Sequence, residues 1–230
     1  MFILDIANLR KSFPTAEGGE KLIVDVEQFQ LKAGSELALA GESGSGKTTF
    51  LHLISGVLKP DSGRIHLDGE PMETLSEAGR DQLRAGTLGY VFQNFNLLQG
   101  MTALENVELA MRFGTGVDKE RASQLLNRMG LSNRLHHYPR QLSMGQQQRV
   151  AVARALANKP KLVLADEPTA HLDHVRGLEA VTLMRDVCKE FGAALLMVSH
   201  DQKILSHFEN IQYFEKLNRA LEQNEKAVKA

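Results

Sequence analysis

Apolar and polar residues alternate along the first third of the chain, and this pattern predicts strands. It runs through "FILDIANLR" (residues 2–10) and "KLIVDVEQFQL" (21–31), on either side of the turn-rich "PTAEGGEK". A short apolar strand in "GSELALAGESG" (34–44) runs into glycines, and "GRIHLDG" (63–69) indicates another strand that ends in a turn. Helical apolar spacing appears in "KTTFLHLISGVL" (47–58) and stops at "KPDSG".

Later in the chain, strands of the buried type alternate with a helix. "KLVLADEP" (161–168) and "GAALLMVSHD" (192–201) are such strands, and "VRGLEAVTLMRDVCKEF" (175–191) is the helix between them. Strand–helix–strand alternation at both ends of the chain predicts an α/β fold with a mainly parallel sheet. The middle, from about 95 to 150, has helical spacing with Thr102 as a helix cap, so we expect an inserted helical lobe there.

Composition narrows the classes of function. A chain of 230 residues, 43% of them hydrophobic, is long enough for one large domain or for a domain with a lobe inserted. The formal net charge of −1 argues against a nucleic-acid partner. A single cysteine favours a reducing compartment, and no apolar run approaches the ~20 residues that a bilayer span needs. We therefore expect a cytoplasmic protein that reaches a membrane only through a partner.

A phosphate-binding loop stands between a predicted strand and a predicted helix, where "GESGSGKT" (41–48) fits G-x-x-x-x-G-K-[ST]. Its glycines permit turns that aim several N–H groups at one anion, and the helix adds its positive end. Lys47 can reach the β- and γ-phosphates, and the Thr48 hydroxyl can ligate Mg²⁺. The predicted nucleotide-binding residues of this loop are Gly41, Glu42, Ser43, Gly44, Ser45, Gly46, Lys47, Thr48 and Thr49.

Polar side chains follow the other predicted strands. Asp166 stands at the end of a buried strand, where it is suited to hold Mg²⁺, and the adjacent Glu167 can polarise the attacking water as a general base. Gln93 ends a strand and can contact both Mg²⁺ and the water. His200 ends another strand and can donate to the γ-phosphate. For Gln93 and His200 the alternative is a surface polar residue at a strand end.

A second loop, "LSMGQ" (142–146), precedes a second helix and repeats the features of an anion site. Ser143 offers a hydroxyl, Gly145 permits close backbone approach, and the helix offers its N-terminus. The first loop already provides a binding site for one triphosphate. The second loop therefore indicates either a second ligand or the same ligand bound to another molecule.

The order and spacing of these motifs resemble the nucleotide-binding subunits of ABC transporters over nearly the entire chain. "GESGSGKTT" resembles their Walker A motif, "LVLADE" their Walker B, "LSMGQ" their signature loop and "AHLD" their D-loop, while Gln93 and His200 match the Q-loop and the switch histidine. The resemblance implies a P-loop NTPase with a RecA-like mainly parallel core, an antiparallel β subdomain and an inserted helical subdomain. It places the ATP-binding domain at 1–219, with the core at about 1–94 and 150–215, the helical subdomain at about 95–149 and a charged tail at 220–230.

In that family two subunits dimerise head to tail, and each ATP lies between one Walker A motif and the other subunit's signature loop. The resemblance implies ATP and Mg²⁺ as cofactors, a homodimer or a heterodimer with a homologue, and adenine stacking on Phe13. It also implies contacts to the partner's ATP from Ser143, Gly145, Gln146 and Asp173. Departures from the family pattern are Met144, His171 and the C-terminal "NIQYFEKLNRAL", which lacks the usual strand–turn–strand.

The stretch "LGYVFQNFNLLQGMTALENVELAM" resembles the subfamily of LolD-, MacB- and FtsE-like ATPases. That implies a membrane permease of the FtsX/MacB type at the inner face of the cell membrane, driven for export, lipoprotein release or mechanotransmission. The alternative is an FtsE-like ATP-gated regulator that moves no substrate. The apolar "FNLL" after Gln93 either meets the permease or belongs to the core of the lobe. A soluble P-loop kinase would leave "LSMGQ" without a role.

Overall fold

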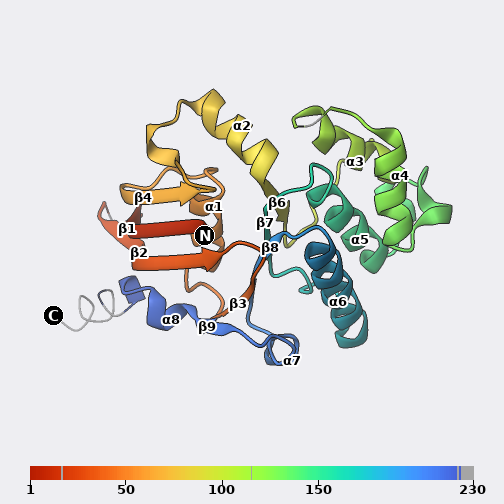
Figure 1. Cartoon of the computed structure of the whole chain (residues 1–230). Coiled ribbons are helices and arrows are strands. Elements are labelled where there is room, and N and C mark those ends of the chain that lie inside the picture. The colour runs from red at the N-terminus through yellow and green to blue at the C-terminus, as the bar shows by residue number, and fades with distance from the viewer. Residues whose placement is uncertain (17, 115, 222, 224–230) are drawn as a thin grey trace.

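The computed structural model describes residues 1–16, 18–114, 116–221 and 223 (Figure 1). Its strands are β1 (Phe2–Pro14), β2 (Glu20–Lys32), β3 (Glu36–Ala40), β4 (Ser62–Leu67), β5 (Glu70–Pro71), β6 (Leu88–Val91), β7 (Leu162–Asp166), β8 (Ala194–Ser199) and β9 (Ile211–Tyr213). Its α-helices are α1 (Lys47–Ile54), α2 (Glu77–Thr87), α3 (Ala103–Arg112), α4 (Lys119–Arg128), α5 (Met144–Ala155), α6 (His174–Glu190), α7 (Gln202–Leu205) and α8 (Phe214–Leu217). Short 3₁₀ turns span Met72–Thr74, Ser132–Arg134 and Pro139–Gln141.

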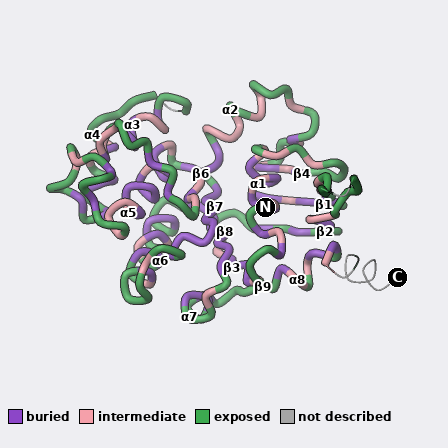
Figure 2. The backbone as a smooth tube through the Cα atoms, turned by 180° about the vertical axis from the view of Figure 1, so that it is seen from behind, coloured by how far each residue is buried: buried purple, intermediate pink, exposed green. Residues whose placement is uncertain are grey.

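A parallel sheet with the order β6-β7-β8-β3-β9 forms the centre of the molecule. Every residue of β7 and β8 is buried, which explains why these strands are continuous apolar runs rather than alternating ones (Figure 2). A second, antiparallel sheet has the order β2-β1-β4-β5. The expected combination of a mainly parallel sheet with an antiparallel β subdomain and helices is confirmed.

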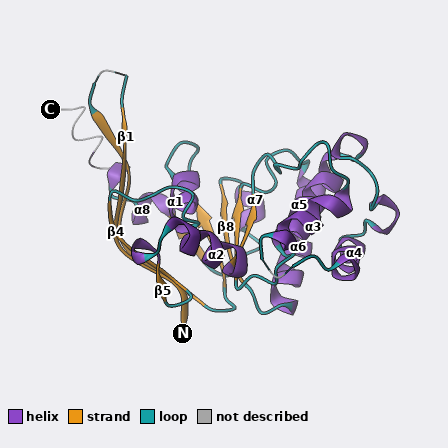
Figure 3. Cartoon of the chain, turned by 90° about the horizontal axis from the view of Figure 1, so that it is seen from above, coloured by secondary structure: helices purple, strands orange, loops and turns teal. Residues whose placement is uncertain are grey.

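The two faces of the parallel sheet are covered by different layers. One face packs on α1 and the antiparallel sheet, in a core that includes Leu196, Val198 and Phe50. The other face packs on α3, α4, α5 and α6, in a core that includes Leu195 and Met197 (Figures 1 and 3). Successive residues of β8 thus enter opposite cores, as the side-chain period of a strand requires. Helix α1 therefore lies on one side of the sheet, and α5 and α6 lie on the other.

Most of the predicted elements are present close to the predicted positions. Thr102 is confirmed as the cap of α3, where its hydroxyl accepts the N–H of Glu105 at 3.3 Å and the Glu105 carboxylate accepts the N–H of Thr102 at 2.7 Å. Helix α2 was not predicted, because it is polar and buries only Thr87, which leaves little apolar periodicity. No helix within the described ranges has the length and apolar character of a membrane span.

The C-terminal edge differs from the family pattern, as expected. The short strand β9 pairs with β3, and α8 follows it directly, so that no strand–turn–strand forms within the described part of this segment. Of the charged tail predicted at 220–230, residues 222 and 224–230 lie outside the described residues. In "FNLL", Phe95 and Leu97 are buried in the core shared with α3 to α6, whereas Leu98 is 47% exposed. Phe95 and Leu97 therefore belong to the lobe core, whereas Asn96 and Leu98 are exposed.

Thr102→Ala is expected to lower the free energy of unfolding by about 1 kcal/mol, because it removes the acceptor for an otherwise unpaired N–H in the first turn of α3. Urea unfolding measures the change. Thr102→Ser keeps the hydroxyl and should remain close to the wild type. An equal loss in both variants would assign the effect to the methyl group instead of the cap.

Candidate active site

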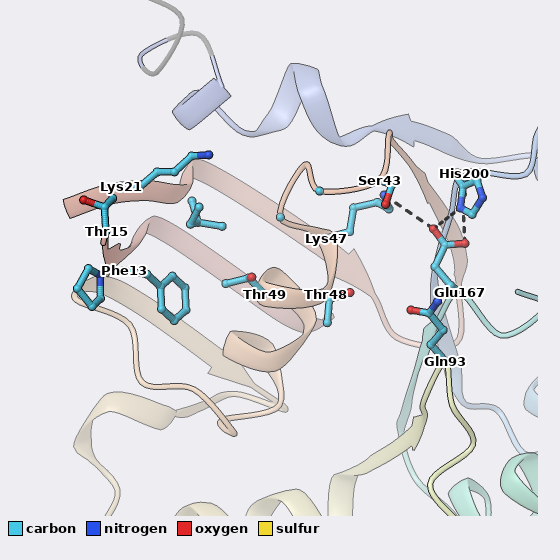
Figure 4. A pocket seen from close by; sticks show the side chains of 14 residues that line it. Phe13, Thr15, Lys21, Ser43, Lys47, Thr48, Thr49, Gln93, Glu167 and His200 are labelled. Carbon is cyan, nitrogen blue, oxygen red and sulfur yellow. Dashed lines mark hydrogen bonds and ion pairs between the residues drawn. The ribbon is translucent and has the colours of Figure 1, made fainter. Parts of the chain in front are cut away.

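The carboxyl ends of parallel strands meet at one edge of the sheet, and the predicted site residues gather there. The phosphate loop follows β3, Gln93 follows β6, Glu167 follows β7 and His200 follows β8. They border a cavity of about 480 Å³ (Figure 4). Its lining consists of Phe13, Pro14, Thr15, Lys21, Ile23, Ser43, Gly44, Gly46, Lys47, Thr48, Thr49, Gln93, Glu167 and His200.

The phosphate loop turns into α1 at Gly46, which has a φ of 101°. A Cβ at this position would lie 2.9 Å from the carbonyl oxygen of Ile23, so both the backbone conformation and the available space require glycine. The turn directs the N-terminus of α1, with its unpaired N–H groups, toward the cavity. The hydroxyl of the neighbouring Ser45 is buried and has no hydrogen-bond partner among the described residues. The Ser45 hydroxyl and the N–H groups at the start of α1 are therefore available to donate hydrogen bonds to an anion.

Lys47 is buried at the start of α1, and its ammonium group is held against the loop. Its Nζ donates to the carbonyl oxygens of Gly41 at 2.7 Å and Glu42 at 2.6 Å. It also lies 3.8 Å from Oε1 of Glu167 (Figure 4). Because an ammonium has three hydrogens, one remains for a further acceptor in the cavity.

Two adjacent carboxylates occupy the end of β7. The Thr48 hydroxyl donates to Oδ1 of Asp166 at 3.1 Å, and burial raises the pKa of the Asp166 carboxyl above its usual range. Glu167 has a φ of 42°, a backbone conformation that is uncommon outside glycine. Its Oε1 lies 2.8 Å from Nδ1 of His200, and its Oε2 accepts the His200 N–H at 3.3 Å (Figure 4). Two hydrogen-bonding contacts therefore hold Glu167 and His200 together at the cavity.

Strands β1 and β2 supply the end of the cavity away from Glu167. Phe13 pairs with Lys21 across these strands, and Thr15 lies beside them (Figure 4). Phe13 was expected here from the sequence, whereas Thr15, Lys21 and Ile23 were not. Only the register between β1 and β2 brings these side chains together, and no local motif encodes it.

The second group of predicted residues lies elsewhere, at the N-termini of α5 and α6 on the other side of the sheet from α1 (Figure 1). The Ser143 hydroxyl accepts the N–H of Gln146 at 3.3 Å, and Oε1 of Gln146 accepts the N–H of Ser143 at 3.0 Å. Asp173 caps α6 by accepting the N–H of Arg176 at 3.1 Å. Ser143 and Asp173 are both exposed. One copy of the chain therefore carries two separate groups of predicted site residues.

Met144 and His171, two departures from the family pattern, are both exposed near this surface. Met144 is 45% exposed at the start of α5. Nε2 of His171 lies 2.9 Å from Oδ1 of Asn94, and its ring meets the edge of Phe95 with centroids 5.9 Å apart. His171 thus links the segment after β7 to the segment after β6.

Asp166→Asn is expected to raise the free energy of unfolding at pH 7 in metal-free buffer. Because the folded-state pKa of Asp166 is raised, its contribution to stability is greatest at low pH and is lost as pH rises through that pKa. The asparagine carbonyl can still accept from Thr48 and carries no charge. Urea titrations between pH 4 and pH 7 should show the gain closing toward low pH.

Asp61→Asn is the matched control with the opposite sign. The hydrogen bond from Lys11 lowers the pKa of Asp61, so its stabilisation is present above the unfolded-state pKa and is lost as pH falls. This variant should be less stable than the wild type at pH 7. A loss of stability at pH 7 in Asp166→Asn as well would contradict the argument from burial.

Comparison with known proteins places the whole arrangement in a family. The ABC transporter family profile matches residues 24–170. The lipoprotein-releasing system ATP-binding protein LolD of Shewanella frigidimarina is 43% identical over 206 residues, 88% of this chain and 85% of the relative. The uncharacterized ABC transporter ATP-binding protein YbbA of Escherichia coli is 42% identical over 205 residues, 88% of this chain and 90% of the relative. The dimeric, post-hydrolysis ATP-binding cassette MJ0796 bound to ADP and Pi has a TM-score of 0.84 at 35% identity, covering 94% of this chain and 95% of that chain. The chain belongs to the ABC transporter family, as one of its ATP-binding cassettes.

Proposed function

We propose that this cassette binds ATP between two copies arranged head to tail, or between one copy and a homologous subunit, and that ATP hydrolysis reopens the pair. The observation that carries the proposal is the separation of the site residues into two groups. The cavity beside α1 has phosphate donors, whereas Ser143, Gly145, Gln146 and Asp173 lie at the start of α5 and α6 and do not line that cavity. A second copy rotated by a two-fold axis brings one group against the other.

The glycine at position 145 supports the proposal that a ligand held by another molecule approaches the second surface. A Cβ there would have its nearest described neighbour, Cδ2 of Leu172, at 4.0 Å, so packing within the chain does not require glycine. Its use is explained if the backbone must closely approach a phosphate held by the facing copy.

Within one copy, we assign the phosphates to the loop from Gly41 to Thr49 and the adenine to Phe13. Lys47 then directs its remaining hydrogen at the β- and γ-phosphates, and the α1 N-terminus adds N–H donors. Lys47 and Phe13 line the same cavity of about 480 Å³, with Phe13 on the side away from Glu167 (Figure 4). Lys21 beside Phe13 adds a further cation at that end.

The residues at the end of β7 fit a Mg²⁺ ion that accompanies the nucleotide. The Thr48 hydroxyl and the Asp166 carboxylate are hard oxygen donors 3.1 Å apart, and the Gln93 amide borders the same cavity. When bound, the ion would neutralise charge on the phosphate oxygens. Burial raises the pKa of Asp166, so a cation bound there would offset the cost of its buried charge.

Glu167 is the proposed general base. It accepts a proton from the attacking water at its carboxylate, and His200 holds that carboxylate in place through Nδ1. The other ring nitrogen of His200 is then free to face the γ-phosphate. Gln93 borders the same space and can orient the water through its amide.

We further propose that the cassette drives a membrane permease of the FtsX/MacB type from the inner face of the cell membrane, and that the pair releases lipoproteins, as the name of the LolD relatives states for them. The helical region at about 95–149 carries the docking surface, where Leu98 is 47% exposed beside a buried core. Co-purification of the permease tests the partner. A permease that moves no substrate would support the FtsE-like regulator instead.

Glu167→Gln is expected to lower ATP hydrolysis about a hundredfold or more, because an amide cannot take the proton, while ATP binding remains. With hydrolysis blocked, the protein should accumulate as a dimer in ATP. Size-exclusion chromatography with light scattering measures this, with Glu209→Gln as a control at an exposed glutamate. A monomer at saturating ATP would contradict head-to-tail binding.

Ser143→Arg in the Glu167→Gln background is expected to bind ATP as a monomer but not to dimerise, because the larger side chain stands where the facing phosphates must enter. Ser143→Thr keeps the hydroxyl that caps α5 and should still dimerise. Nucleotide binding and size-exclusion chromatography are measured on each variant. Loss of ATP binding by the Ser143→Arg monomer would show that Ser143 serves its own copy's site.

A further inference from the structure

The back of the phosphate loop is held by the segment that departs from the family pattern. Three residues at the C-terminal end of the described chain, Phe214, Glu215 and Asn218, contact this loop, and we call them the C-terminal clamp. Oε1 of Glu215 accepts the N–H of Glu42 at 2.7 Å. Nδ2 of Asn218 donates to the carbonyl oxygen of Ser45 at 3.2 Å.

The clamp is itself firmly anchored. Asn218 is fully buried; its Oδ1 accepts the N–H of Asp25 at 2.8 Å, and its Nδ2 also donates to the carbonyl oxygen of Ile23 at 2.8 Å. The ring of Phe214 is buried against Phe50 of α1, with centroids 5.4 Å apart. The segment therefore cannot shift without breaking contacts to β2 and α1.

The clamp also leaves no room for a side chain at the start of the loop. A Cβ on Gly41 would lie 2.9 Å from Oε1 of Glu215 and 3.2 Å from Cβ of Phe214. The same Cβ would lie 3.2 Å from Cδ of Lys47. Glu215 and Lys47 thus approach Gly41 together, and a side chain at this position would crowd Phe214 and push the Glu215 carboxylate aside.

One peptide group connects Glu215 to Lys47. The carbonyl oxygen of Gly41 accepts from Nζ of Lys47 at 2.7 Å, and the N–H of the same peptide bond, which belongs to Glu42, donates to Glu215 at 2.7 Å. Because the peptide unit is planar and trans, its C=O and N–H point in opposite directions. Holding the N–H at Glu215 therefore fixes the direction in which the carbonyl meets the ammonium of Lys47.

The clamp and the cavity use different residues of the loop. Ser43, Gly44 and Gly46 line the cavity, whereas the clamp holds the backbone of Glu42 and Ser45. A glycine-rich loop has high conformational freedom, and ordering it during binding weakens affinity. Contacts from outside the cavity order the loop beforehand and leave its inner N–H groups available.

We propose that Glu215 is a positioning residue for nucleotide binding, which fixes the Gly41–Glu42 peptide and through it the ammonium of Lys47. The inference rests on the proposed placement of the phosphates at this loop. Glu215 needs only an acceptor oxygen for this role, and its negative charge does not contribute to binding a triphosphate. Replacing the carboxylate by an amide therefore preserves the effect, and replacing it by an apolar group removes it.

The test compares Glu215→Gln and Glu215→Leu in the full chain, with Glu209→Leu as a control at an exposed glutamate outside the clamp. The Kd for ATP is measured by calorimetry in the Glu167→Gln background, together with the Tm of each nucleotide-free protein. We expect Glu215→Leu to raise the Kd about five- to tenfold, the scale of one ordinary hydrogen bond lost. Glu215→Gln and Glu209→Leu should stay within about twofold of the parent protein.

The proposal is overturned if Glu215→Leu binds ATP like the parent, or if it lowers the Tm without changing the Kd, because the contact is then only structural. An equal loss in Glu215→Gln would overturn it too, since the charge and not the acceptor would matter. Lys47→Ala separates this failure from a failure of the proposed site. If Lys47→Ala loses ATP and Glu215→Leu does not, the clamp alone is wrong, and if neither loses ATP, the phosphates bind elsewhere.

Discussion

In a parallel sheet every strand ends at the same edge, and this chain places a different group at each of several such ends. A glycine-rich loop follows β3, an amide follows β6, carboxylates follow β7 and an imidazole follows β8. These groups come from distant parts of the sequence, and the shared direction of the strands is what brings them to one cavity. The antiparallel sheet supplies one end of the cavity at this edge, and the C-terminal clamp holds the phosphate loop. The outer helices α5 and α6 carry the second group of site residues.

The charges that the site buries lower the stability of the folded chain. Asp166 and Glu167 are adjacent and buried, with the ammonium of Lys47 at 3.8 Å from Glu167 as a nearby cation. Burial raises the pKa of Asp166, so the carboxylate costs stability at neutral pH. The unusual backbone of Glu167 adds strain at the same point. Nucleotide and cation binding would compensate these costs, which couples the stability of the cassette to its ligand.

The two groups of site residues lie on opposite sides of the central sheet. Under the proposed function, ATP therefore joins two copies of the chain in addition to being hydrolysed. Ser143 and Asp173 cap α5 and α6 within their own chain, so their side chains already have structural partners. Gly145 has no such internal reason. Under the proposed function, a ligand that completes both groups would join two copies, and its hydrolysis would release them. His171, which contacts Asn94, links the surface near Asp173 to the segment after β6. Under the proposed function, this contact would connect the interface between copies to the helical side of the molecule.

The sequence by itself determined whatever depends on neighbouring residues. The phosphate loop, the acidic pair after β7, the helix cap at Thr102 and the buried strands are all encoded in short contiguous stretches, because turn geometry, capping and apolar periodicity are local. Tertiary structure alone decided the contacts between distant segments. The position of Lys21 beside Phe13 depends on the register between β1 and β2. The contact between Glu215 and Glu42 of the phosphate loop joins residues that are 173 positions apart in the chain. No local preference encodes such pairs, since they form only when the packed cores have placed both segments at the same edge of the sheet.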